Sequence, residues 1–228
     1  NRALSAAEIN FLYNRGGPVA HYRFDEGSGT TAFDSAEAND GTLTNMDAAT
    51  DWVKGQYGTA LDFDGSDDNI VLANESNFDF EGTDTFSACA WIYMDSFSSG
   101  GRTILSKLGA TTTGWEFSAY EQGGNGNGLT LYLISSWSGD VVQAESADIL
   151  SLNTWEHVCF AYSGSTTVSG VSFYLNGVSQ TVAAQKDTVS GTILNDNAVI
   201  IGDRNENLPF DGLIDDVRIY SYARTPEE

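Results

Sequence analysis

The chain has 228 residues, of which 41% are apolar, and 32 acidic against 10 basic side chains give it a net charge of −22. This length suits one large domain with its own core. The negative charge argues against nucleic acid or an anionic membrane as a partner, since like charges repel. No apolar run reaches the ~18 residues of a membrane span, and no signal peptide opens the chain.

The first segment, residues 1–17, carries a helix signal. Ser5 and Glu8 have the spacing of a capping box, and apolar residues follow. Residues 2–8 also resemble residues 222–228, at an offset of one whole domain. We therefore expect residues 1–17 to be the tail helix of a preceding tandem copy or an N-terminal extension, with the main domain at 18–228. The chain would be one monomeric unit excised from an array.

Beyond residue 18 the sequence consists of short apolar or alternating runs separated by Gly, Asn, Asp and Ser, which is typical of all-β proteins. The predicted strands are residues 20–25, 60–63, 70–72, 86–94, 129–134, 155–162, 171–175, 178–182, 199–201 and 213–220. Asn176-Gly177 predicts a type I′ hairpin, and Asp64-Gly65 predicts a weaker hairpin between 60–63 and 70–72. The run at 86–94 is apolar on both faces, which indicates a central strand. For Trp91 and Trp155, in two such strands, we expect core packing.

The strand at 213–220 contains a carboxylate among apolar residues. Strict alternation places Asp215 on the face of Leu213, Val217 and Ile219. A buried carboxylate costs several kcal/mol unless it is paired, hydrogen-bonded or bound to a metal. Because the chain has few cations, Asp215 indicates a bound calcium ion; the alternative is a loop capped through backbone N–H groups.

Two cysteines, Cys89 and Cys159, lie in two of the predicted strands. The pair is compatible with one disulfide in a secreted protein. It is equally compatible with two buried thiols that behave as small apolar residues.

Six motifs in order resemble the laminin-G-like jelly-roll domains of the concanavalin A-like lectin/glucanase superfamily, over residues 18–224. They are His21-Tyr22-Arg23-Phe24-Asp25-Glu26-Gly27-Ser28-Gly29, Ala60-Leu61-Asp62-Phe63-Asp64-Gly65, Phe86-Ser87-Ala88-Cys89-Ala90-Trp91-Ile92, Trp155-Glu156-His157-Val158, Phe173-Tyr174-Leu175-Asn176-Gly177 and Phe210-Asp211-Gly212-Leu213-Ile214-Asp215-Asp216-Val217. The resemblance implies a two-sheet antiparallel jelly-roll β-sandwich. It also implies an extracellular module, secreted or on a cell surface.

Pentraxins look like distant relatives, and their corresponding cysteines are bonded, which favours a Cys89–Cys159 disulfide. Their double calcium site does not transfer. Its Asp-Asn pair would fall near residues 109–113, which hold no carboxylate, and only Asp203, Asn205 and Glu206 stand where its other ligands would be.

A single structural calcium, as related jelly rolls hold, fits better. The resemblance implies Asp215 as one ligand together with oxygens near the first strand. The candidates there are Asp25, Asp34, Asn39 and Gly41. Calcium takes six to eight such hard oxygens. An ion between Asp25 and Asp215 would join the two ends of the domain.

Other chemical signals are weak. Residues 62–69 are rich in aspartate but lack the glycine and glutamate positions of an EF-hand, so a turn is expected. Glu116 and Glu121, the nearest candidates for a glycosidase pair, are five apart and point to opposite strand faces. His157 lacks an orienting acid and is expected to pack beside Trp155. We therefore expect no catalytic residue.

Aromatic rings in polar segments offer a carbohydrate surface, because sugars stack on them. Of Trp115, Tyr120, Tyr132 and Trp137, we expect Trp137 to be exposed; Asn125, Asn127 and Asn205 are polar companions. The candidate ligand-binding set is Trp115, Tyr120, Trp137, Asn205 and Glu206. The alternative is that these are ordinary loop residues.

The sequence thus predicts a non-catalytic, calcium-stabilised carbohydrate-binding or adhesion module of a multidomain extracellular protein. A structural spacer or protein-binding repeat is the alternative from a different class. A glycoside hydrolase or lyase is the third possibility. An exposed aromatic cluster would favour the first hypothesis.

Overall fold

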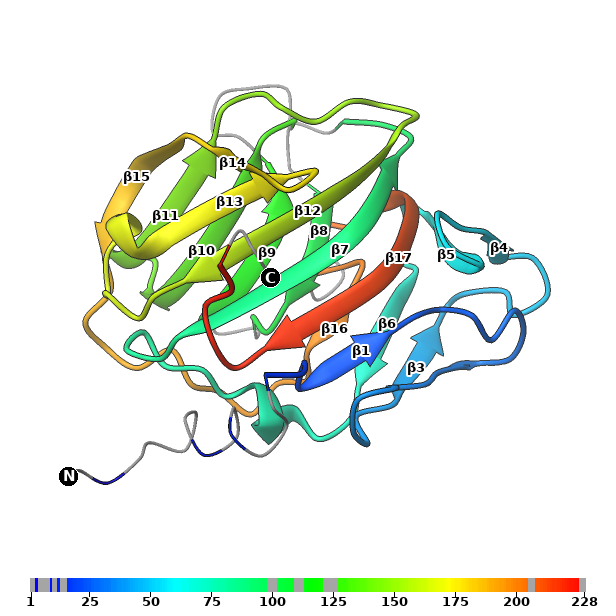
Figure 1. The fold of residues 1–228 in the computed structure, drawn as a ribbon, viewed down its shortest axis with the longest axis horizontal. Coiled ribbons are helices and arrows are strands. Elements are labelled where there is room, and N and C mark those ends of the chain that lie inside the picture. The colour runs from blue at the N-terminus through cyan, green and yellow to red at the C-terminus, as the bar shows by residue number, and fades with distance from the viewer. Residues whose placement is uncertain are drawn as a thin grey trace.

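The computed structural model describes residues 3, 9, 12, 16–97, 102–108, 113–120, 127–204 and 208–225. They form two antiparallel β-sheets packed face to face, with two short 3-10 helices, η1 (Glu75–Phe78) and η2 (Val168–Gly170) (Figure 1). The predicted all-β sandwich is confirmed. The helix predicted within residues 1–17 lies almost wholly outside the described residues, so it and the boundary at residue 18 stay predictions. Within the described ranges, no helix is long and apolar enough to cross a membrane.

The first sheet has eight strands in the order β14-β13-β12-β7-β17-β5-β4, and β1 also pairs with β17. Its members are β1 (Ala20–Tyr22), β4 (Trp52–Lys54), β5 (Thr59–Asp64), β7 (Phe86–Met94), β12 (Trp155–Tyr162), β13 (Val171–Leu175), β14 (Val178–Gln180) and β17 (Asp211–Tyr220). The predicted central strand is confirmed, because β7 lies between β12 and β17 (Figure 1).

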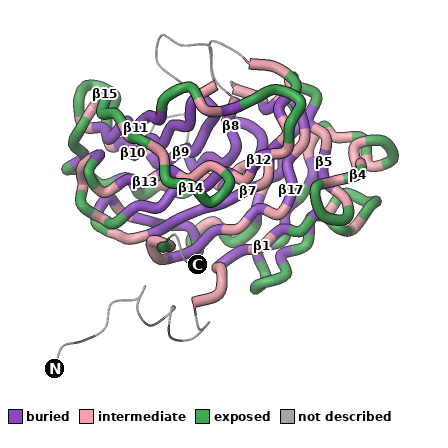
Figure 2. The backbone as a smooth tube through the Cα atoms, turned by 45° about the horizontal axis from the view of Figure 1, so that its top comes forward, coloured by how far each residue is buried: buried purple, intermediate pink, exposed green. Residues whose placement is uncertain are grey.

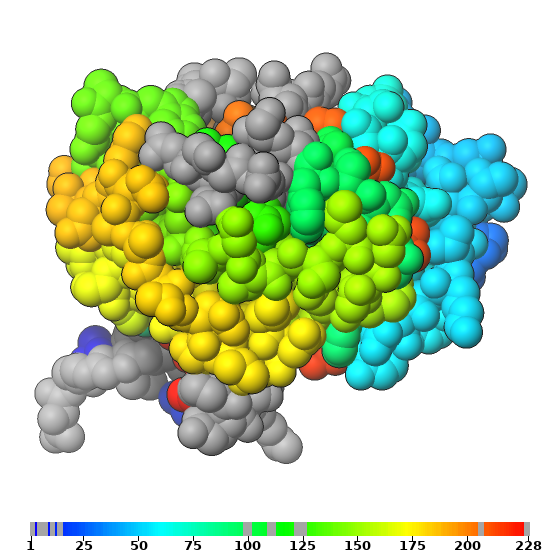
Figure 3. Space-filling view, turned by 90° about the horizontal axis from the view of Figure 1, so that it is seen from above, coloured from blue at the N-terminus to red at the C-terminus, as the bar shows by residue number. Residues whose placement is uncertain are grey.

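The second sheet has nine strands in the order β15-β11-β10-β9-β8-β16-β6-β3-β2. They are β2 (Thr31–Ala32), β3 (Gly41–Thr44), β6 (Asn69–Leu72), β8 (Arg102–Ser106), β9 (Gly114–Ala119), β10 (Leu129–Ser136), β11 (Asp140–Ser146), β15 (Val182–Thr188) and β16 (Ile200–Ile201). Strands β3 to β6 lie at one end of the sandwich, in blue and cyan. Strands β11, β14 and β15 lie at the other (Figures 1 and 3).

The core fills the space between the sheets, where the inward-facing side chains of the inner strands are buried (Figure 2). Phe86 is at its centre: its ring centroid lies 5.3 Å from that of Phe160 on β12 and 5.7 Å from that of Trp115 on β9 of the facing sheet. Truncating such a buried ring typically costs about 3–5 kcal/mol. The alternation that buries Phe86 directs Cys89 and Trp91 of β7 to the outer face.

Of the two predicted hairpins, one is confirmed and the other is wrong. Asn176 and Gly177 have φ angles of 51° and 78°, and they join β13 to β14 with Leu175 opposite Val178. β5 and β6, on either side of Asp64-Gly65, do not pair. β5 pairs with β4 and β17, whereas β6 pairs with β3 and β16 of the other sheet. β5 and β6 therefore belong to different sheets, and the chain between them crosses from one sheet to the other. Both strands still contribute apolar residues to the same core.

A β-bulge in β17 overturns the predicted alternation around Asp215. Asp216 has a φ of 48°, and the register with β7 shifts between Asp215 and Arg218. The bulge reverses the phase, so Val217 and Ile219 face the core while Asp215 stands opposite Trp91 on the outer face. The far edge of β17 pairs with β5 before the bulge and with β1 after it. The bulge thus falls where the first and last strands of the domain meet.

Candidate functional site

A cavity of about 510 Å³ opens on the outer face of the first sheet, beside the bulge. We call it the first-sheet pocket. Its lining comes from β1, β7, β12, β17 and the β4–β5 turn: His21, Arg23, Asp25, Tyr57, Trp91, His157, Asp215, Asp216 and Arg218. It gathers both histidines of the chain and two of the 10 basic residues. This concentration of donors stands out in a chain of net charge −22.

Aromatic rings form one wall of the pocket. The Trp91 ring meets the exposed Tyr57 ring edge to face at 5.8 Å, and the His157 imidazole lies 5.2 Å from Trp91 on its other side. The expectation that Trp91 packs in the core is wrong, because β7 is apolar on both faces and periodicity could not say which face is inside. His157 lies two residues after Trp155 in β12, and the Trp155 ring contacts Tyr93 at 5.7 Å, so the expected packing of His157 beside Trp155 stays a prediction. The burial of His157 lowers the pKa of its imidazole, so it is neutral near pH 7.

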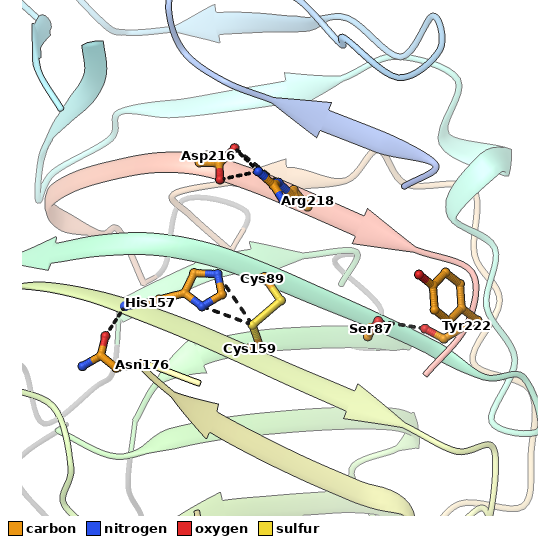
Figure 4. Close-up of a disulfide and its surroundings, with 8 residues drawn as sticks. All are labelled: Ser87, Cys89, His157, Cys159, Asn176, Asp216, Arg218 and Tyr222. Atoms are coloured by element: carbon orange, nitrogen blue, oxygen red, sulfur yellow. Dashed lines mark hydrogen bonds and ion pairs between the residues drawn. A yellow bond between two sulfur atoms is a disulfide. The ribbon is translucent and has the colours of Figure 1, made fainter. Parts of the chain in front are cut away.

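A charged network forms another wall. Asp216 Oδ1 lies 2.6 Å from Nε2 of His21, and its Oδ2 accepts a hydrogen bond of 2.8 Å from Nη2 of Arg218 (Figure 4). Burial alone would raise the pKa of Asp216, but the hydrogen bond from His21 and the charge of Arg218 outweigh it and hold the pKa below its usual range. The pocket thus presents a fixed carboxylate and a guanidinium beside an aromatic surface.

Asp215 and Asp25 form the acidic floor, on either side of the β4–β5 turn. Asp215 is fully buried; its Oδ2 accepts the Tyr57 N–H at 2.9 Å, while Oδ1 finds no hydrogen-bond partner among the described residues. Burial, with the charges of Asp216 and Asp25, raises the pKa of Asp215 to about 6. Asp25 Oδ1 accepts the Thr59 N–H at 3.2 Å. It fits so closely over Gly58, whose φ is 57°, that a Cβ there would collide with it.

The other predicted calcium ligands are not gathered at this floor. Asp34 closes its own loop: Oδ1 accepts the N–H groups of His21 and Ala36, and Oδ2 accepts two N–H bonds from Asn39. Gly41 lies inside β3, paired with Ala32 and Leu72. A carboxylate that already accepts four N–H bonds has no need of an ion, so of the predicted set only Asp25 and Asp215 fit one.

The disulfide between Cys89 and Cys159 is present and joins β7 to β12 on the same outer face (Figure 4). Both nitrogens of the His157 ring lie within 3.9 Å of the Cys159 sulfur. The bridge therefore continues the surface of the first-sheet pocket.

The aspartates at residues 62–69 form a loop closed on itself, as the turn interpretation predicts. Asp68 Oδ2 accepts the Asp64 N–H at 3.0 Å, and Asp64 Oδ1 accepts the Ser66 N–H at 2.8 Å. Asp64, Asp67 and Asp68 are close enough to meet at an ion. Exposed acidic side chains commonly gather without one, and nothing else in the loop indicates a site.

The aromatic residues predicted to bind ligand divide between the core and the outer face of the second sheet. Trp115 is 1% exposed and packs in the core, so its ring is not available to a ligand. Tyr120 and Tyr132 lie 6.5 Å apart on the outer face, and Tyr132 lies 5.4 Å from Trp137. Trp137 is 36% exposed, as expected, with Lys186 Nζ 5.0 Å above its ring. Asn205 and Glu206 lie outside the described residues.

Glu116 shares that outer face and is fully buried. Its Oε2 accepts a bond of 3.2 Å from Arg204, while Oε1 has no partner among the described residues. Burial raises the pKa of Glu116, although the charge of Arg204 opposes the rise. Glu121 lies outside the described residues, so the predicted absence of a glycosidase pair stays a prediction.

Sequence reasoning missed Tyr57, Arg23 and the Asp216–Arg218 pair as parts of one site. They come from segments up to 195 residues apart, brought together by the pairing of β1 with β17 and by the bulge. Sequence reasoning placed Asp25 and Asp215 at the two ends of the domain but did not predict that β1 pairs with β17. The bulge had one sequence signal, the doubled Asp215-Asp216, because aspartate tolerates positive φ.

The chain belongs to the concanavalin A-like lectin/glucanases superfamily, whose family model matches residues 64–228. Domain 4 of AbnA, a GH43 extracellular arabinanase from Geobacillus stearothermophilus solved with arabinotriose, is 24% identical. The alignment covers 92% of this chain and 95% of that one, with a TM-score of 0.63.

Two further solved structures share the fold at lower identity. The binding domain of Paraclostridial Mosquitocidal Protein 1 is 14% identical over 94% of this chain and 51% of that one, with a TM-score of 0.66. The ligand-binding domain of botulinum neurotoxin serotype D, solved with N-acetylneuraminic acid, is 14% identical over 94% and 49%, with a TM-score of 0.63. No curated protein matches the sequence.

Proposed function

We propose that the chain is a non-catalytic glycan-binding module of an extracellular protein, and that the first-sheet pocket is its binding site. The observation that carries the proposal is the pairing of an aromatic wall, Trp91 and Tyr57, with the fixed Asp216–Arg218 pair in one open cavity of about 510 Å³. Small-molecule sites usually occupy ~300–1,000 Å³ and combine apolar surface with a few placed polar groups. A sugar requires both, a ring face for its C–H surface and planar polar groups for its hydroxyls.

The relatives support this proposal. Two structures with the same fold were solved with a bound sugar, arabinotriose in one and N-acetylneuraminic acid in the other. The disulfide suits an oxidising, extracellular setting.

The test is a broad glycan array followed by calorimetry on the hits. We expect the Trp91→Ala variant to lose about five- to tenfold in affinity, since a ring stack contributes roughly 1–1.5 kcal/mol. Trp137→Ala, the matched control on the second sheet, should bind as the wild type does. Loss with Trp137→Ala alone would move the site to the second sheet. A blank array for the wild-type protein would favour a spacer or protein-binding repeat.

Calcium is a separate part of the proposal, supported by the buried Asp215 Oδ1 that lacks a partner and by Asp25 beside it. These two carboxylates would hold the ion, which would neutralise them and tie the β4–β5 turn to β17. Ligand at 100 times its Kd would stabilise the fold by about 2.7 kcal/mol. Thermal unfolding in calcium and in EDTA tests this. The calcium-dependent rise in Tm should vanish in Asp215→Asn and persist in Asp34→Asn. A wild-type Tm that is the same in calcium and in EDTA would refute the calcium site.

A further inference from the structure

A second hollow adjoins the first-sheet pocket on the same face. It has a volume of about 150 Å³ and shares His157 and Arg218 with the first. Its own wall residues include Tyr174 on β13 and Tyr220 on β17. The two hollows share His157 on β12 and Arg218 on β17, with β7 between these strands, so together they form one groove across the outer face.

The floor of the second hollow is a single row across four strands. Arg218 on β17 stands opposite Cys89 on β7, Cys89 opposite Cys159 on β12, and Cys159 opposite Tyr174 on β13. With neighbouring strands ~4.8 Å apart, the row spans about 14 Å. The disulfide at its centre fixes two of the four strands, so the floor is rigid before any ligand arrives. Figure 4 shows the disulfide beside His157, with Asp216 and Arg218 on the strand that runs past them.

The far end of the groove is open. Gly177, in the β13–β14 turn, also lines the second hollow, and a Cβ added there would meet no atom within 4 Å. At the near end, the first hollow opens past Arg23 and the exposed Tyr57. A chain lying in the groove can therefore leave it at both ends.

The groove also offers ring faces and donors along its length. Trp91 serves the first hollow, and Tyr174, half-buried, serves the second. The guanidinium of Arg224 lies 4.4 Å above the Tyr220 ring at the rim of the second hollow. A ring face with a fixed guanidinium in each hollow is a repeated unit of sugar recognition.

We propose that this groove binds an unbranched oligosaccharide across two subsites, with one sugar against Trp91 and a following sugar over the disulfide and Tyr174. The inference rests on the proposed glycan-binding function and specifies its ligand class. The second hollow has less than a third of the volume of the first, 150 against 510 Å³, which suits a single further sugar unit of a chain. The net charge of −22 disfavours a polyanionic chain.

The experiment measures affinity against chain length by calorimetry, with arabino-, xylo-, cello-, manno- and malto-oligosaccharides of one to six units. For the series that binds, affinity should rise with length and level off once the groove is filled. Tyr174→Ala should lower the affinity for the longer members about tenfold and leave that for the monosaccharide unchanged. Tyr93→Ala is the matched control, since Tyr93 lies on the same face but lines neither hollow.

The outcomes separate this inference from the proposed function. Equal affinity at all lengths, or a Tyr174→Ala variant that binds all lengths as the wild type does, would overturn the second subsite and leave the first intact. Stronger binding of branched chains would overturn it too. No binding in any series or on the array would overturn both. If Tyr174→Ala does not fold, Arg224→Gln, with the same expected length dependence, takes its place.

Discussion

Each outer face of the sandwich holds a carboxyl group beside an arginine, but the pKa values of the two carboxyl groups are shifted in opposite directions. On the first sheet, Asp216 has two cationic or polar partners, His21 and Arg218, and its pKa lies below the usual range. On the second sheet, Glu116 has Arg204 alone among its described cationic neighbours and is fully buried, and its pKa lies above the usual range.

The difference shows that an arginine nearby does not decide the state of a carboxylate. The balance between lost hydration and the bonds that replace it decides. At Asp216 several bonds replace the water, so the charge stays and is available to a ligand in an open pocket. At Glu116 one bond of 3.2 Å does not compensate for complete burial. The Asp216 carboxylate on the first face therefore stays charged and can meet a ligand, whereas a charged Glu116 on the second face destabilises the fold.

The largest expected effect on stability concerns the Cys89–Cys159 disulfide, which lies on the first face. Replacing Cys89 and Cys159 together with alanine should lower the free energy of unfolding by about 4 kcal/mol, since the bridge closes a loop of 70 residues. Urea denaturation of the variant and the wild type measures it. An unchanged midpoint would mean that the first sheet is rigid without its bridge.

Ser118 and Thr130, directly opposite each other on β9 and β10, are the matched pair on the second face. Replacing Thr130 with alanine should cost no more than about 1 kcal/mol, because its hydroxyl donates a single hydrogen bond to the Tyr120 carbonyl.

The second prediction tests the charge on the first face. Asp216→Asn should cost about 2 kcal/mol at pH 7, because Arg218 and His21 lose a charged acceptor. Asparagine tolerates the φ of 48° at this position, so the backbone is not strained. Urea denaturation at low and high salt checks this, and the loss should shrink in salt. A variant as stable as the wild type at both salt concentrations would show that the charge of Asp216 contributes nothing to stability.

The sequence predicted most of the fold because the fold depends on local patterns. The run at 86–94, apolar on both faces, predicted a central strand, and the Asn176-Gly177 turn predicted a hairpin; the structure agrees with both. The sequence-based prediction failed at Asp215, because one extra residue in β17 reverses the face to which each later side chain of the strand points. Strict alternation has no means of placing such a bulge.

The candidate site was less predictable, because it depends on which face of a doubly apolar strand looks outward. Trp91 and Trp115 illustrate the problem. The first was expected inside and faces the pocket, whereas the second was expected to meet a ligand and lies in the core. Only the register between strands far apart in sequence settles such cases.

The third prediction concerns Glu116, where removing the charge should stabilise the protein rather than destabilise it. Glu116→Gln should raise the free energy of unfolding at pH 8 and leave it unchanged at pH 4. The folded-state pKa of Glu116 is raised above its unfolded value of 4.5, so stability is lost as pH rises from that value through the folded pKa. Glutamine removes the charge that is lost from water and keeps an oxygen for Arg204. Urea denaturation at the two pH values decides, and a glutamine variant less stable at pH 8 would contradict the assignment.

The smallest expected effect concerns Lys186 above Trp137. Lys186→Met keeps the aliphatic stem but removes the charge 5.0 Å from the ring centre, so it should cost about 0.5–1 kcal/mol. Urea denaturation measures this effect. Glycan affinity gives the sharper comparison, because binding in the first-sheet pocket should ignore this change on the opposite sheet. If Lys186→Met altered affinity as strongly as Trp91→Ala, the second face would be the binding face, and the Asp216 network would serve stability alone.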